Sequence, residues 1–128
     1  MGHRLLIVDD SAMTRAVIRR TISLSGVEAD AVLDAPDGHA ALAALAAHPV
    51  DLVLTDLNMP GMDGAELVGR IRADRRLDAV RVLVISADPN TERLEGLRRS
   101  GAAGYLRKPF SPEQLRGALE QLIGAPHV

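Results

Sequence analysis

Five short apolar runs recur along the chain, separated by longer stretches in which apolar residues follow helical spacing. The runs cover residues 4–8, 29–33, 50–55, 80–85 and 104–107, and the second is the least apolar. Each is too short for a helix, and three of them are rich in Val, Leu and Ile, which is typical of buried parallel strands. The pattern therefore predicts five strands.

A helix is predicted after each strand, and most carry a recognisable start or stop. Ser11 begins the first and Gly26 ends it, and Gly101 ends the fourth. The third and fifth begin with capping boxes, Asp63 with Glu66 and Ser111 with Gln114, the latter with Pro112 at the first helical position. The predicted ranges are 11–26, 37–48, 63–73, 90–100 and 111–124. The apolar residues at helical spacing are Met13, Val17, Ile18 and Ile22, then Leu42 and Leu45, then Leu67, Val68 and Ile71, then Leu94 and Leu97, and finally Leu115, Leu119, Leu122 and Ile123.

Strict alternation of strand and helix predicts an α/β fold, a parallel sheet covered on both faces through right-handed crossovers. A length of 128 residues suits one domain, and we expect residues 1–128 to form it with no output domain. One doubly wound strand order, 2-1-3-4-5, makes the first and third strands neighbours and opens a crevice between their carboxyl ends.

The amino-acid composition excludes several classes of protein. The chain has no cysteine, so it holds no disulfide and no thiolate metal site. A formal net charge of −2 gives no electrostatic footprint for nucleic acid. No apolar run is long enough to span a bilayer, and the N-terminus lacks a secretory pattern. We expect a cytoplasmic protein that binds neither nucleic acid nor membrane.

Chemistry-bearing residues stand where the predicted strands end. The first strand ends on Asp9 and Asp10, the third on Asp56, the fourth on Ser86 and the fifth on Lys108. In the order 2-1-3-4-5 the three carboxylates share one pocket, where they repel one another unless a cation lies between them. Hard oxygen ligands favour Mg²⁺, with Mn²⁺ as a second choice. Acid, metal, ammonium and hydroxyl groups together predict phosphoryl transfer, for which an aspartate can be the nucleophile.

The lysine is the only one in the chain, since the other 14 of the 15 basic residues are arginines. One explanation is chance, which a single exception among fifteen basic residues does not exclude. The physical alternative is that position 108 requires a compact ammonium charge in place of a planar guanidinium.

These residues, with Tyr105 and the sequence Lys108-Pro109-Phe110, resemble the receiver domain of two-component response regulators, most closely the single-domain chemotaxis type. The resemblance covers nearly the whole chain and implies the flavodoxin-like (βα)₅ fold. It further implies that Asp56 accepts a phosphoryl group from a histidine kinase, a phosphotransfer protein or a small acyl phosphate. Catalysis would extend only to the protein's own phosphorylation and dephosphorylation.

The resemblance also assigns roles to the other residues. Mg²⁺ would be held by Asp10, Asp56 and the backbone carbonyl of Asn58, with Asp9 acting through water. Lys108 would pair with the phosphoryl oxygens and Ser86 would hydrogen-bond one of them. The switch pair would be Ser86 and Tyr105, and the Lys108–Pro109 bond would be cis. The expected protein is a monomeric switch whose downstream protein target the sequence does not name.

Each residue has an ordinary interpretation when taken alone: a solvated strand end, a helix cap, a loop carboxylate or a surface charge. Their joint placement at successive strand ends favours the phosphoryl site. The alternative function is a small-molecule phosphatase that forms an aspartyl phosphate. Such an enzyme usually has an Asp-x-Asp pair, whereas Asp56-Leu57-Asn58 places an amide at the second position. A scaffold that has lost its chemistry is a third interpretation, which the intact residue set disfavours.

The fourth predicted helix is expected to be among the least stable elements. Gly96 lies in its interior, where glycine costs roughly 1 kcal/mol relative to alanine. Its apolar contribution comes mainly from Leu94 and Leu97. A segment of low local stability is suited to conformational switching.

Overall fold

The computed structural model describes residues 2–123. Strands and helices alternate along the chain in the order β1 (His3–Val8), α1 (Ala12–Ser25), β2 (Ala29–Ala35), α2 (Gly38–Ala47), β3 (Leu52–Asp56), α3 (Gly64–Ala73), a 3₁₀ turn η1 (Arg75–Leu77), β4 (Arg81–Ser86), α4 (Thr91–Arg99), β5 (Gly104–Arg107) and α5 (Pro112–Ile123).

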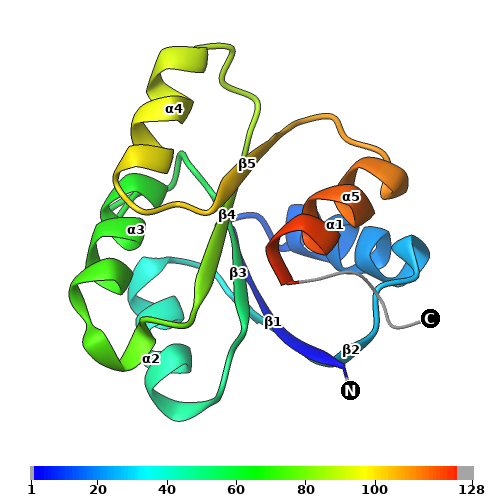
Figure 1. The fold of residues 1–128 in the computed structure, drawn as a ribbon, viewed down its shortest axis with the longest axis horizontal. Helices are drawn as coiled ribbons and strands as arrows, with labels where there is room; N and C mark the ends of the chain where they lie inside the picture. The colour runs from blue at the N-terminus through cyan, green and yellow to red at the C-terminus, as the bar shows by residue number, and fades with distance from the viewer. Residues whose placement is uncertain (1, 124–128) are drawn as a thin grey trace.

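The strands form one parallel sheet in the order β2-β1-β3-β4-β5, which confirms the predicted fold class and topology. Helices α1 and α5 cover one face, and α2, α3 and α4 cover the other (Figure 1). Because every connection is a crossover, all five strands direct their carboxyl ends to the same edge of the sheet.

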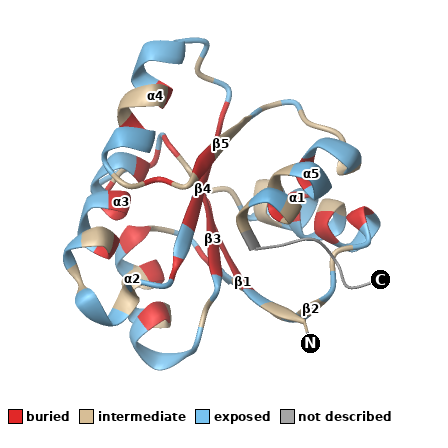
Figure 2. Ribbon diagram, viewed as in Figure 1, coloured by how far each residue is buried: buried red, intermediate tan, exposed pale blue. Residues whose placement is uncertain are grey.

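The three central strands are buried on both faces, as their continuous apolar runs require (Figure 2). Alternate side chains enter two separate cores. Val53 and Val84 belong to the core under α2, α3 and α4, whereas Leu54 and Ile85 belong to the core under α1 and α5. Two packed cores fix the sheet, so that the loops at its carboxyl edge rest on a rigid support.

Helix ends follow the sequence signals with one correction. Ser111 and Gln114 form the reciprocal capping box that the sequence predicts, with N–H to side-chain distances of 2.8 and 3.1 Å. The box predicted at Asp63 forms only half: Asp63 accepts the Glu66 N–H at 2.8 Å. The prediction of a full box was wrong because the Glu66 carboxylate pairs instead with Arg70, one turn further along the helix, at 2.9 Å.

Other differences from the sequence are local. The 3₁₀ turn at Arg75–Leu77 was not predicted. Strand β2 runs to Ala35 because its pairing with β1 continues to the Val8–Ala35 partners. Among the apolar residues of α1, Ile18 and Ile22 are buried, but Met13 and Val17 are exposed.

Two predictions lie outside what the structure describes. They are the core position of the Ile123 side chain and the helix end at Gly124. Within the described residues, none of the helices is long and apolar enough to cross a bilayer.

Candidate functional site

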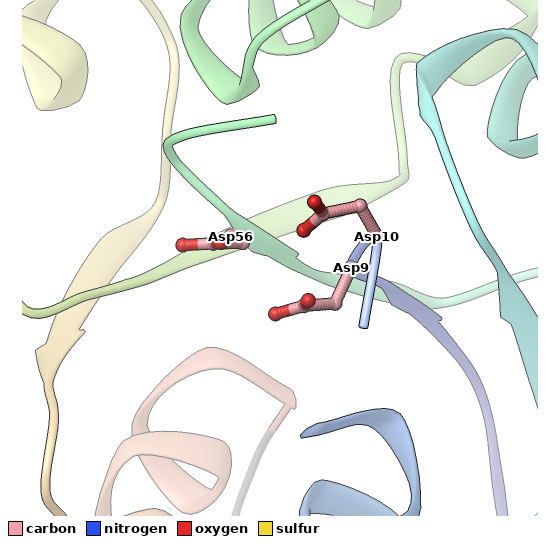
Figure 3. A group of neighbouring side chains, drawn as sticks. All are labelled: Asp9, Asp10 and Asp56. Atoms are coloured by element: carbon pink, nitrogen blue, oxygen red, sulfur yellow. The ribbon is translucent and has the colours of Figure 1, made fainter. Parts of the chain in front are cut away.

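Three aspartates meet at the carboxyl edge of the sheet. Val8 of β1 lies opposite Thr55 of β3 in the parallel register, so the residues that follow them, Asp9 and Asp56, come out side by side. Asp10 follows Asp9 in the loop after β1. One carboxylate oxygen from each of the three lies within 4.8 Å of the others (Figure 3). The structure therefore brings together the acids that the strand ends predict.

Asp9 is the most deeply placed of the three and is only 2% exposed. Its Oδ1 accepts the Ser11 N–H at 2.9 Å, which fixes the carboxylate beside the start of α1. Its Oδ2 is buried and has no hydrogen-bond partner among the described residues. A buried carboxylate oxygen without a hydrogen bond is costly, and a metal cation in the pocket would satisfy it.

Asp56 ends β3 and is half-buried. Its Oδ1 accepts the Leu57 N–H at 2.8 Å, so the carboxylate is held against the loop that follows the strand. Burial raises the pKa of Asp56 above 3.8; the Lys108 ammonium opposes that rise in pKa, and the Asp9 carboxylate adds to it. The carboxylate is thus held partly desolvated, and its remaining stabilisation comes from one ammonium group and two backbone N–H groups.

Lys108 supplies that ammonium group. Its Nζ lies 3.6 Å from Asp9 Oδ2 and 3.7 Å from Asp56 Oδ1, so both contacts are ion pairs too long to be hydrogen bonds. Its backbone N–H donates to the carbonyl of Ser86 at 2.9 Å, which anchors the loop after β5 to the end of β4. The following Lys108–Pro109 bond is cis, as the resemblance implied.

The donor set fits a hard divalent cation. The carboxylates of Asp9, Asp10 and Asp56 converge, and Asp10 is exposed to solvent. Asp9 Oδ2 accepts no hydrogen bond and lies 3.6 Å from Lys108 Nζ. Oxygen ligands without His or Cys suit Mg²⁺. Asn58, also expected to contribute, is exposed and lies two residues after Asp56, and its backbone N–H lowers the pKa of the Asp56 carboxyl group.

The two expected switch residues lie on the sheet face covered by α4. Ser86 is 1% exposed, and its Oγ accepts the Asp88 N–H at 3.0 Å. Tyr105 lies opposite Val84 in the β4–β5 pairing. Its side chain is half-buried and packs against the core under α2, α3 and α4. Its hydroxyl group donates to Glu95 Oε1 at 3.2 Å.

Sequence reasoning missed the residues of α4 and of the loop before it that contact these two. Asp88 accepts the Asn90 N–H at 2.8 Å and pairs with Arg93 at 2.9 Å, which links the Ser86 loop to the first turn of α4. Glu95 and Arg98 both contact Tyr105. Their spacing of three places them on one side of a helix, but no sequence signal shows which side turns toward β5.

The structure is a five-stranded parallel α/β domain that gathers three aspartates and a lysine at the carboxyl edge of its sheet. Residues 5–120 match the family model of the response regulator receiver domain, and the chain belongs to that family.

Curated relatives and solved structures agree with this membership. The chain is 35% identical over 122 residues to chemotaxis protein CheY1 of Helicobacter pylori, covering 94% of this chain and 97% of that protein. It is 34% identical over 120 residues to chemotaxis protein CheY of Pseudomonas aeruginosa, covering 94% and 95% of the two chains. The solved structure of chemotaxis protein CheY4 of Vibrio cholerae superposes with a TM-score of 0.84 at 32% identity, covering 95% of this chain and 99% of that one. The chain is therefore a receiver domain of the chemotaxis type, a signalling domain of two-component systems.

Proposed function

We propose that this protein is a phosphorylation-dependent switch that accepts a phosphoryl group on Asp56 and thereby changes its affinity for a partner protein. The observation that carries the proposal is the placement of Asp56 within a cluster of two further carboxylates, with the Lys108 ammonium 3.7 Å away. This arrangement can offer a carboxylate nucleophile and, beside it, a positive charge for the phosphoryl oxygens.

The transfer follows from the positions of these groups. A carboxylate oxygen of Asp56 attacks phosphorus, and the bond between phosphorus and the donor breaks, with the electron pair leaving on the donor's imidazole nitrogen or carboxylate oxygen. Lys108 turns its ammonium from the two carboxylates toward the phosphoryl oxygens. Mg²⁺ would be held by Asp10, Asp56 and the Asn58 carbonyl, with Asp9 acting through water, and it would supply further charge neutralisation. The backbone N–H group of Leu57 holds the nucleophile in place.

The phosphodonor is a histidine kinase or a phosphotransfer protein. An apolar groove of about 440 Å³ has Lys108 in its lining, together with Val17, Ile18 and Phe110 among others. The lining residue Val17 is 57% exposed, and Met13 in the first turn of the same helix is 79% exposed. Large apolar side chains grouped beside the acceptor site favour docking of a protein donor there.

The signal leaves through α4 and β5. Ser86 lies at the end of β4, and Asp88 connects it to the first turn of α4 through the Asn90 N–H and Arg93. When the Ser86 hydroxyl turns toward a phosphoryl oxygen, this loop shifts and space opens for the Tyr105 ring. The partner then reads the surface formed by α4, β5 and α5. Phosphate can favour the second arrangement only by its difference in affinity for the two.

The competing function is a small-molecule phosphatase that works through the same aspartyl phosphate. Asn58 stands where that chemistry places a second acid, so turnover is not expected. The two functions differ in stoichiometry: a switch gains one phosphoryl group per chain, whereas a phosphatase releases phosphate continuously from an outside ester.

The test uses Mg²⁺ and a small acyl phosphate, with intact-mass detection. The wild-type protein should gain one phosphoryl group that hydroxylamine removes, and Asp56→Asn should not gain it. Equal labelling of the variant would show that another residue is the acceptor. Sustained phosphate release from simple phosphate esters would favour the phosphatase.

A further inference from the structure

We infer that Glu95 and Arg98 of α4 form a clasp that holds the half-buried Tyr105 ring beside α4, an arrangement called outward below, and thereby keeps the unphosphorylated protein in its resting state. The inference rests on the proposed function in one respect, namely that Tyr105 moves when Asp56 is phosphorylated. What it adds is an autoinhibitory contact made by two side chains outside the phosphorylation site.

The two residues of the clasp contact the Tyr105 side chain at two different places. The Tyr105 hydroxyl group donates to Glu95 Oε1 at 3.2 Å, which fixes the outer end of the side chain. The Arg98 guanidinium carbon lies 5.5 Å from the ring centroid, within the distance at which a cation is attracted to an aromatic face. Glu95 and Arg98 are one turn apart, so a single side of α4 holds both the edge and the face of the ring.

Helix α4 does not depend on the clasp for its own position. Leu94 and Leu97 bury its inner side, at 1% and 6% exposure. Arg107 of β5 separately donates to Thr91 Oγ1 at 2.6 Å, which ties the start of the helix to the strand. Removing the clasp should therefore free the ring while α4 stays packed on β5, and this separates a regulatory role from a structural one.

The size of the effect follows from the two contacts. A hydrogen bond to a partly exposed charged group shifts a two-state ratio by roughly fivefold to tenfold. An exposed cation–π contact shifts it by roughly twofold to fivefold. Each substitution should thus raise the ratio of the inward to the outward population of the Tyr105 ring by these factors. Because coupling between two sites is reciprocal, affinity for a phosphoryl mimic at Asp56 should rise by up to the same factor, if the outward state dominates in the wild type.

Tyr105 is the only tyrosine of the chain, so 3-fluorotyrosine incorporation gives one ¹⁹F resonance that reports its ring. The variants are Glu95→Ala, Glu95→Gln and Arg98→Ala. The matched controls are Glu92→Gln and Arg99→Gln, which change the same charges on the exposed side of the same helix. Within the described part of the chain, neither control residue makes a hydrogen bond or a cation–π contact with Tyr105. The wild-type resonance with Mg²⁺ and beryllofluoride defines the inward limit.

In the unliganded protein the clasp variants should move the resonance toward that limit, and the controls should not. The dissociation constant for beryllofluoride, measured with Mg²⁺, should fall about fivefold in Glu95→Ala and about twofold in Arg98→Ala. Unchanged dissociation constants in all clasp variants, at wild-type melting temperature, would overturn the clasp while leaving the proposed function intact. Failure of the wild type itself to bind beryllofluoride would instead refute the proposed function. A resonance shift in the unliganded variants that points away from the inward limit would also refute the clasp.

Discussion

Gly64, the first residue of α3, sets how closely that helix approaches the loop that carries Asp56. A β-carbon at this position would lie 2.5 Å from the carbonyl oxygen of Asp56 and 2.8 Å from the Cα of Leu57. Both atoms belong to the backbone, and the Gly64 N–H also donates to the Leu57 carbonyl at 2.8 Å. Gly64→Ala must therefore push the helix away from the loop and move the nucleophile with it.

The matched control lies on the same helix. A β-carbon on Gly69 would meet nothing within 4 Å, and the position is exposed. Overpacking against a fixed backbone costs about 1–3 kcal/mol, so Gly64→Ala should lower the melting temperature by roughly 5–10 °C. Gly69→Ala should gain about 0.5–1 kcal/mol from helix propensity and raise the melting temperature by roughly 2–4 °C.

Thermal unfolding followed by circular dichroism measures both shifts, and acyl phosphate labelling measures the consequence for the site. Gly64→Ala should label more slowly than the wild type at a temperature where both are folded, because Asp56 has moved relative to Lys108. Gly69→Ala should label at the wild-type rate. If Gly64→Ala melted at or above the wild-type temperature and labelled normally, the close approach of α3 to the Asp56 loop would be wrong.

Three further outcomes are expected. The pKa of Asp56 in the folded protein lies above its unfolded value of 3.8. Without Mg²⁺, the free energy of unfolding is therefore highest below pH 3.8 and falls as the pH rises through the folded pKa. Asp56→Asn should remove this pH-dependent loss of stability and raise the melting temperature at neutral pH. Millimolar Mg²⁺ should raise the melting temperature of the wild type by mass action, and Asp10→Asn should reduce that rise; no Mg²⁺ effect on the wild type would contradict the shared site. Val17→Arg should slow phosphorylation by a histidine kinase but not by acyl phosphate, whereas equal slowing of both would remove α1 as the docking surface.

The sequence predicts the sheet well because its signals are strong and local. Apolar runs that end on Asp9, Asp56 and Lys108 specify both the strands and the edge where chemistry gathers. The exposure of Met13 and Val17 was not predictable in the same way. Helical spacing does not distinguish a side turned toward the core from one left open beside a groove, and only the packing of α1 against the sheet decides it.

Side-chain partners were the least predictable part. Glu66 had two possible partners within reach, the Asp63 backbone and Arg70, and the capping rule selected the wrong one. The contact between Tyr105 and Glu95 depends on how α4 is rotated over β5, a tertiary feature that no pattern within either element records. Where several local options have similar energies, the sequence leaves the choice to packing.

The claim that the chemistry at Asp56 controls the α4–β5 surface is tested most directly by amide hydrogen exchange with and without beryllofluoride. Protection should change most in residues 87–107, and Ser86→Ala should blunt that change while leaving Asp56 open to phosphorylation. A change confined to residues 56–64, with residues 87–107 unaltered, would contradict the account and show that the signal leaves by another surface.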